Sequence, residues 1–236
     1  QYYQTLPNNL GEYLYTSFEK EYDTKPGINF SKENPEIPIV LVCSYLMAIV
    51  LGRQYMSTRP PMHLRNQLIV WNALLSSFSF IGALRIVPEL LYRLQLGTFV
   101  DTITTPSAIS WGRGASGLWT QLFVYSKIPE LGDTYFIIAR KRPLLFLHWY
   151  HHVTVLLYCW HSYATEAPQA LYFIGMNYMV HSIMYGCYCL MAMKMKPAWL
   201  SPVIITVAQI AQMVMGTTIQ GVSTYVYITQ EDHNLN

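Results

Sequence analysis

The chain has 236 residues, of which 52% are hydrophobic and only 12% are charged, and its formal net charge is +2. Soluble domains carry about 25% charged residues, so this composition argues against a soluble protein and indicates one whose solvent is lipid. We expect no nucleic-acid partner.

Apolar runs of about 18 residues or more are candidates for membrane-spanning helices. We predict six spans, at residues 37–52, 67–87, 116–139, 143–163, 168–191 and 199–228. The predicted fold is therefore all-α, a polytopic membrane helix bundle over residues 37–228. A polar tail (1–36) precedes the bundle, and a short tail (229–236) follows it.

The loops between these spans differ in charge. Loops 53–66, 140–142 and 192–198 carry Arg or Lys and no acid, whereas the tails and the segment with Glu166 are acidic or mixed. Because basic loops stay in the cytosol, we predict a cytosolic position for these three loops and a non-cytosolic position for both tails.

Ionisable side chains inside a membrane span are costly, so they are candidates for function. The third span contains Lys127, Glu130 and Asp133. The lysine and one of the carboxylates could form a buried ion pair, and Pro129 between them is expected to bend the helix.

Three further polar rows follow along the chain. The fourth span contains His148, His151 and His152; the fifth contains Asn177, His181, Tyr185 and Tyr188; and the sixth contains Thr206, Gln209 and Gln212. Spacings of three and four residues place each row on one helix face. At about 1.5 Å per residue, all rows lie roughly 7–20 Å from the cytosolic end. We therefore predict that they converge on one site, although single Gln or Asn side chains often only join helices.

The pattern His-x-x-His-His at residues 148–152 is compatible with two chemistries. A membrane di-iron desaturase or hydroxylase needs about eight histidine ligands. This chain has seven in all, of which His148, His151, His152 and His181 can reach the polar band, so we predict no metal. Imidazole is also a nucleophile and a base near neutral pH, and it can accept an acyl group from a thioester. A proton-coupled transporter remains a non-enzymatic alternative.

Four ordered motifs resemble those of the ELO family of very-long-chain fatty-acid elongases. They are Lys127-x-x-Glu130-Leu131-x-Asp133-Thr134, His148-x-x-His151-His152, Met176-Asn177-x-x-x-His181-x-x-Met184-Tyr185 and Thr206-x-x-Gln209-x-x-Gln212. The residues around the histidines are most similar to the branch that acts on saturated and monounsaturated acyl-CoAs.

The resemblance implies an acyltransferase of the endoplasmic-reticulum membrane. It would be a 3-oxoacyl-CoA synthase, condensing a long-chain acyl-CoA with malonyl-CoA and releasing CO₂ and CoA, with no cofactor. It also implies 3-oxoacyl-CoA reductase, dehydratase and enoyl-CoA reductase as partners beside membrane lipid, and it leaves a homo-oligomer open. Family members have seven membrane helices, so we expect that a seventh helix is missing from this chain.

On these residues we predict His151 as the nucleophile, with His181 opposite it across the cavity. His148 and His152 would orient it and move protons, and Asp133 and Glu130 would hold imidazole tautomers. Donors to the oxyanion would be Asn177, Gln209 and Gln212. Lys127 is also predicted to be catalytic. The remaining residues of the predicted site would bind the substrate: Tyr185, Arg140, Lys141 and Arg142. A cysteine nucleophile, Cys187 or Cys189, is the rival within the enzyme class.

Overall fold

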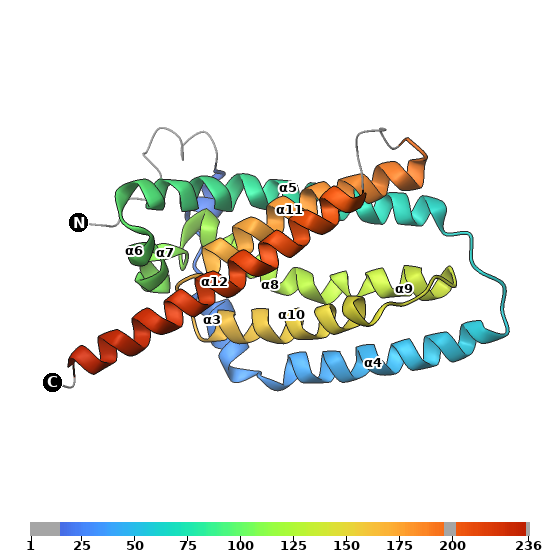
Figure 1. Ribbon diagram of the computed structural model, residues 1–236, viewed down its shortest axis with the longest axis horizontal. Helices are drawn as coiled ribbons and strands as arrows, with labels where there is room; N and C mark the ends of the chain where they lie inside the picture. Colours follow the sequence, from blue (N-terminus) through green and yellow to red (C-terminus); the bar gives the residue numbers. More distant parts are fainter. Residues whose placement is uncertain (1–14, 196–201, 235–236) are drawn as a thin grey trace.

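The computed structural model of the chain describes residues 15–195 and 202–234, and for residues 202 and 230–234 it describes the backbone alone. Helices form most of this part of the chain (Figure 1). They are α2 (Ser17–Lys20), α3 (Lys25–Glu33), α4 (Glu36–Ser57), α5 (Arg65–Leu96), α6 (Phe99–Thr104), α7 (Ser107–Ser110), α8 (Gly114–Glu130), α9 (Gly132–Ala139), α10 (Phe146–Ala164), α11 (Ala170–Met193) and α12 (Pro202–Asn234). The predicted all-α bundle is confirmed.

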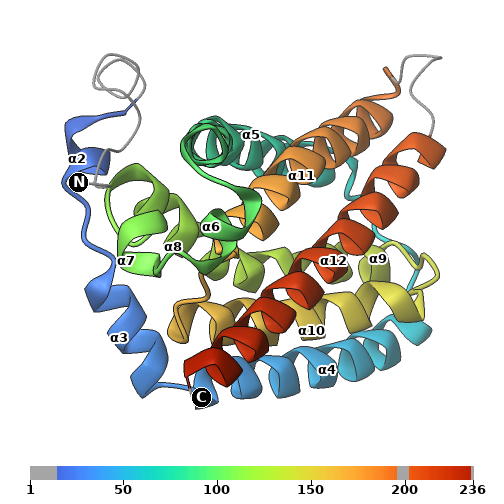
Figure 2. The same ribbon diagram turned by 60° about the vertical axis from the view of Figure 1, so that its left-hand side comes forward.

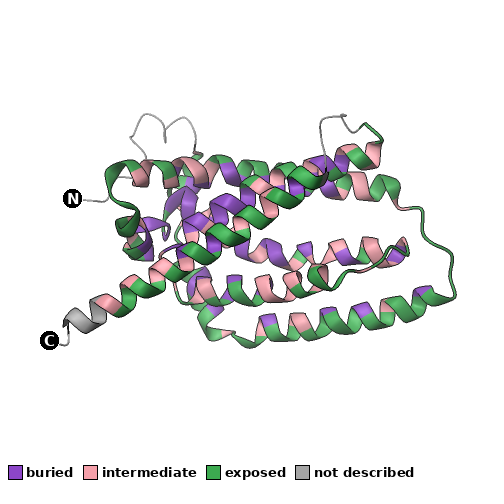
Figure 3. Ribbon diagram, in the orientation of Figure 1, coloured by how far each residue is buried: buried purple, intermediate pink, exposed green. Residues whose placement is uncertain are grey.

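The six predicted spans fall on α4, α5, α8 with α9, α10, α11 and α12. That all six cross the membrane stays a prediction. Three of them are long and apolar enough to cross a membrane: Glu36–Ser57, Arg65–Leu96 and Val203–Thr229. The other three predicted spans, now α8 with α9, α10 and α11, contain the lysine, carboxylate and histidine residues of the polar rows. Much of α4 and of the described part of α12 is exposed (Figure 3). Many of these exposed side chains are large and apolar, as expected of helices that face lipid.

The third predicted span is broken into two helices. Helix α8 ends at Glu130 and α9 begins at Gly132, directly after Pro129. Proline has no N–H to donate within a helix, so the expected bend is confirmed. Gly132 allows close packing at this point, because a Cβ there would lie 3.1 Å from Cζ2 of Trp71 on α5. Because Glu130 belongs to α8 and Asp133 to α9, the two side chains need not follow the spacing of one continuous helix.

The loops predicted to share one side of the membrane lie at one end of the bundle. Arg65 Nε donates to the Ala192 carbonyl oxygen at 2.7 Å, and the Met62 N–H donates to the Ala139 carbonyl oxygen at 2.9 Å. At the opposite end, Lys32 pairs with Glu166 at 2.7 Å. At the end formed by the three basic loops, every charged side chain among the described residues is a cation: Arg53, Arg59, Arg65, Arg140, Lys141, Arg142 and Lys194. We call this the basic end. Lys196 lies outside the described residues.

Helices α5 and α11 form the scaffold of the bundle, and α12 lies along α11 (Figure 2). Gly82 of α5 lets the two backbones approach, because a Cβ there would come within 2.5 Å of the Tyr178 ring on α11. The Tyr178 hydroxyl donates to the Trp119 carbonyl oxygen of α8 at 2.9 Å. Small residues at such contacts are typical of membrane helices. This packing fixes the helix that presents His181.

The described part of the N-terminal tail is anchored by a buried carboxylate. Glu19 of α2 accepts hydrogen bonds from Arg85 Nε and Trp119 Nε1, both at 2.8 Å, and from the Thr16 backbone N–H at 2.8 Å. Burial alone would raise the pKa of this carboxyl, but these hydrogen bonds lower it from 4.5 to about 2. A carboxyl whose pKa is lower in the folded state stabilises the fold above about pH 4.5, and this contribution disappears as the pH falls to about 2.

Glu19→Gln should therefore destabilise the protein at neutral pH by about 1.5–3 kcal/mol, the range for hydrogen bonds to a charged group. Thermal unfolding of the purified protein in detergent measures the effect, with Glu21→Gln, an exposed neighbour, as the control. The difference between wild type and Glu19→Gln should shrink as the pH is lowered from 4.5 toward 2. If the difference in stability between wild type and Glu19→Gln is the same above pH 4.5 as between pH 4.5 and 2, the pKa of Glu19 is not lowered in the folded protein.

Candidate active site

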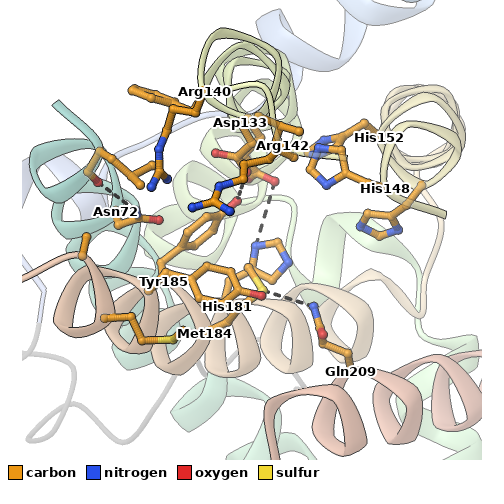
Figure 4. Close-up of a pocket in the computed structure, with 18 residues that line it drawn as sticks. Asn72, Asp133, Arg140, Arg142, His148, His152, His181, Met184, Tyr185 and Gln209 are labelled. Carbon is orange, nitrogen blue, oxygen red and sulfur yellow. Dashed lines mark hydrogen bonds and ion pairs between the residues drawn. The ribbon is translucent and has the colours of Figure 1, made fainter. Parts of the chain in front are cut away.

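A cavity of about 530 Å³ lies inside the bundle. It reaches the basic end, where Arg140, Arg142, Met191 and Ala192 line it, and it extends to the four histidines of the predicted site (Figure 4). The lining residues are Leu68, Asn72, Glu130, Asp133, Phe136, Ile137, Arg140, Arg142, His148, His151, His152, His181, Met184, Tyr185, Tyr188, Met191, Ala192 and Gln209. The predicted convergence of the polar rows therefore occurs.

Helix α10 presents three imidazoles to this cavity. It begins at Phe146, and the spacing of His148, His151 and His152 places their rings on one side. The ring centroids of His148 and His152 are 4.6 Å apart, and those of His151 and His152 are 5.8 Å apart. No side-chain hydrogen bond from the described residues occupies either ring nitrogen of His151 or His152. These two imidazoles are available to a substrate.

His148 is held by a short hydrogen-bonded chain. Its Nε2 lies 3.0 Å from the Thr134 hydroxyl of α9, and that hydroxyl lies 2.7 Å from the Tyr45 hydroxyl of α4. Neither Tyr45 nor this use of Thr134 was predicted, although Thr134 directly follows Asp133 in the motif of the third predicted span. These hydrogen bonds fix the ring of His148 against α9. Its predicted role in orienting His151 stays a prediction.

A buried ion pair lies beside the histidines. Lys127 Nζ donates to both carboxylate oxygens of Glu130, at 2.8 and 3.0 Å, and the two residues are 4% and 6% exposed. Lys127 also donates to Asn177 Oδ1 at 3.2 Å, and Ser126 donates to Glu130 Oε1 at 3.0 Å. The lysine does not line the cavity. The sequence left the choice between Glu130 and Asp133 open, and the structure pairs Lys127 with Glu130.

Asp133 has partners other than imidazole. Its Oδ1 accepts from Trp71 Nε1 at 2.6 Å, and its Oδ2 accepts from the Tyr185 hydroxyl at 2.7 Å. The prediction that Asp133 holds an imidazole tautomer is not met by this geometry. The aspartate instead fixes an indole and a phenol in the cavity wall. Trp71 could not be singled out from sequence, because a tryptophan in an apolar span is an ordinary packing residue.

His181 and Asn177 are neighbours on α11. The Asn177 side-chain nitrogen and His181 Nε2 are 3.1 Å apart, and His181 Nδ1 lies 3.9 Å from Glu130 Oε2. Both polar ends of the Asn177 amide are thus engaged, one with Lys127 and the other with His181. Asn177 does not line the cavity, so its predicted role as a donor to the oxyanion stays a prediction that this arrangement does not support.

The three consecutive basic residues after α9 separate into two groups. Lys141 has a positive φ of 53°, and its Nζ donates to the Ser57 carbonyl oxygen at 3.2 Å, away from the cavity. Arg140 and Arg142 on either side line the cavity. The predicted substrate contact therefore fits the two arginines and not Lys141.

Gln209 lines the cavity from α12, and its side-chain nitrogen lies 3.1 Å from Met184 Sδ. Gln212, one turn further along, is half-buried but is not part of the lining, so its predicted role as a donor is not met. Asn72 of α5 was missed: its Nδ2 donates to the Leu68 carbonyl oxygen at 2.7 Å, and it lines the cavity. A polar residue within a span was the signal that could have found it.

The two candidate cysteines lie elsewhere. Cys187 packs in an apolar cluster with Leu75, Met184 and Ile205, and Cys189 Sγ lies 3.6 Å from the Ile69 carbonyl oxygen. Neither lines the cavity, which disfavours a cysteine nucleophile. Within the described residues no group of three or more His, Cys, Asp or Glu side chains is placed to hold a metal ion.

Comparisons with known proteins agree on one family. Residues 30–236 match the ELO family, described as the GNS1/SUR4 family. Very long chain fatty acid elongase 6 of Drosophila melanogaster is 49% identical over 175 residues, which are 74% of this chain and 55% of that protein. The protein of the same name from Mus musculus is 40% identical over 202 residues, covering 86% and 75% of the two chains. Very long chain fatty acid elongase 3 of Mus musculus is 41% identical over 214 residues, covering 89% and 75%. The chain thus spans little more than half the length of its Drosophila relative.

Proposed function

The chain belongs to the ELO family, and we propose that it is a fatty-acid elongase. In this proposal it acts as a 3-oxoacyl-CoA synthase, joining a long-chain acyl-CoA to malonyl-CoA. The predicted alternatives, a di-iron desaturase and a proton-coupled transporter, gain no support from the comparisons.

One observation carries the proposal: four imidazoles line a cavity that reaches the basic end of a membrane bundle. An acyl-CoA has a polyanionic head group and an apolar tail. Arg140 and Arg142 at the mouth can attract the CoA phosphates, and apolar side chains such as Leu68, Phe136 and Met184 fit the hydrocarbon. The thioester is then brought to the histidines.

His151 is the proposed nucleophile. Its unprotonated imidazole nitrogen attacks the acyl carbonyl carbon and the C–S bond breaks. The N–H proton of the acylated ring passes to the CoA thiolate, leaving a neutral acyl-imidazole and free CoA. Malonyl-CoA then loses CO₂, and the electron pair of the broken C–C bond forms an enolate. The enolate carbon attacks the acyl carbon and the C–N bond breaks, giving a 3-oxoacyl-CoA two carbons longer. The leaving imidazole nitrogen takes up a proton from water, which restores neutral His151.

The cellular setting follows from the same proposal. We place the enzyme in the endoplasmic-reticulum membrane, with a reductase, a dehydratase and an enoyl-CoA reductase consuming its product in turn. The test of the activity uses the purified protein in detergent, labelled malonyl-CoA and a series of saturated and monounsaturated acyl-CoAs. Labelled 3-oxoacyl-CoA should form. Its absence with every acyl-CoA, from protein that is folded, would reject the proposal.

Removing metal ions should leave this activity unchanged. The proposed acyl transfer uses the imidazole of His151 and no metal ion, so EDTA or a strong iron chelator should alter the rate of condensation by less than about twofold, well below the 10²-fold or greater effect of removing a catalytic group. The metal content of the same sample is measured alongside the rate. Stoichiometric iron or zinc whose removal abolishes activity would contradict the acyl-imidazole route.

A further inference from the structure

Lys127, Asn177 and His181 form a chain in which each member determines the orientation of the next. A lysine ammonium has three N–H donors and no acceptor. Those of Lys127 face the two Glu130 oxygens and Asn177 Oδ1, so the Asn177 side chain must present its oxygen to the lysine. The amide nitrogen of Asn177 is then the end that faces His181 Nε2 at 3.1 Å.

This orientation decides the tautomer of His181. Because the Asn177 amide nitrogen can only donate, His181 Nε2 must accept and so carries no proton. The proton of the neutral imidazole is on Nδ1, on the side of Glu130 Oε2. The separation of these two atoms, 3.9 Å, is too long for a hydrogen bond. His181 lines the cavity, so its Nδ1–H is a donor that a substrate oxygen can satisfy.

We propose that Lys127 and Asn177 are positioning residues that hold His181 in the Nδ1–H tautomer, and that His181 donates a hydrogen bond to the thioester oxygen of the substrate. In this role His181 is neither the base nor the nucleophile, because Asn177 occupies the lone pair on Nε2. The negative charge on the acyl-CoA thioester oxygen in the first tetrahedral adduct is stabilised by Nδ1–H, and so is the charge on the malonyl-CoA thioester oxygen in the later enolate. The donor role rests on the proposed function, because it needs a thioester substrate. The tautomer of His181 follows from the hydrogen bonds alone.

Two experiments test the chain separately. Nitrogen NMR of the protein labelled with ¹⁵N-histidine, with the His181 signals assigned from a His181→Gln spectrum, should show a protonated Nδ1 and an unprotonated Nε2. In Asn177→Asp, Nε2 should gain a proton, because a carboxylate can only accept. Asn34→Asp, an exposed amide at the end of α3, is the control. A protonated Nε2 in the wild type, or an unprotonated one in Asn177→Asp, would overturn the positioning role.

The donor role is tested by comparing two replacements of His181. His181→Leu removes the donor and should reduce kcat by roughly 10²–10³-fold with little change in KM, the effect of losing one oxyanion donor. His181→Gln keeps an N–H and should recover part of the loss. Equal loss in both variants would show that His181 acts as a base or nucleophile. If the wild type fails to condense any acyl-CoA, the proposed function fails while the NMR result still decides the tautomer.

Discussion

His151→Ala should abolish both release of CoA from acyl-CoA and the later condensation. An acyl-imidazole route is a two-step exchange, so the wild type given acyl-CoA alone should release CoA and retain the acyl chain. Removing the nucleophile should lower both rates by at least about 10³-fold. The measurement is free thiol released by purified protein before and after malonyl-CoA is added.

The matched control is His161→Ala. His161 lies on the same helix, ten positions further along, but it is exposed and outside the cavity. Its replacement should leave both rates unchanged. Gln209→Ala should give an intermediate result, a loss of about 10²–10³-fold in condensation, if its amide is one donor to the oxyanion. Release of CoA that begins only after malonyl-CoA is added to the wild type would contradict the two-step route.

Lys127→Met should destabilise the protein by about 3–5 kcal/mol, because it leaves the buried Glu130 carboxylate without its counter-charge. The double variant Lys127→Met/Glu130→Gln removes both charges and should recover most of this loss. Thermal unfolding of the purified proteins in detergent gives the comparison. A double variant as unstable as Lys127→Met would show that the pair is not coupled as its 2.8 Å contact indicates.

Lys32→Met provides the control for an exposed ion pair. Lys32 and Glu166 are also in contact at 2.7 Å, but their side chains are 47% and 36% exposed. Water screens such a pair, so its loss should cost no more than about 1 kcal/mol. The contrast between the two lysines separates the effect of burial from that of a lost contact.

The helices and the main face of the site could be predicted from spacing. Periods of three and four residues placed His148, His151 and His152 on one face, and the depth argument brought His181 and Gln209 to the same band. The shared helix face and the shared depth depend only on helix geometry and on the end from which each span is counted. In the structure, these five residues line one cavity.

The hydrogen-bond partners could not be predicted in the same way. Whether Asp133 faces an imidazole or Trp71 depends on the rotation of α9 after the break at Pro129, which no periodicity encodes. The outward turn of Lys141 depends on one positive φ angle. The link from Asn177 to Lys127 joins residues 50 positions apart on different helices. Such contacts are set by tertiary packing.

Mass spectrometry of a trapped intermediate tests the central claim most directly. Purified protein is incubated with acyl-CoA in the absence of malonyl-CoA, quenched, digested and searched for an acylated peptide. The acyl-imidazole route predicts the adduct on His151, within α10, and its disappearance when malonyl-CoA is added before the quench. An adduct on Cys187 or Cys189 of α11 would contradict the histidine chemistry.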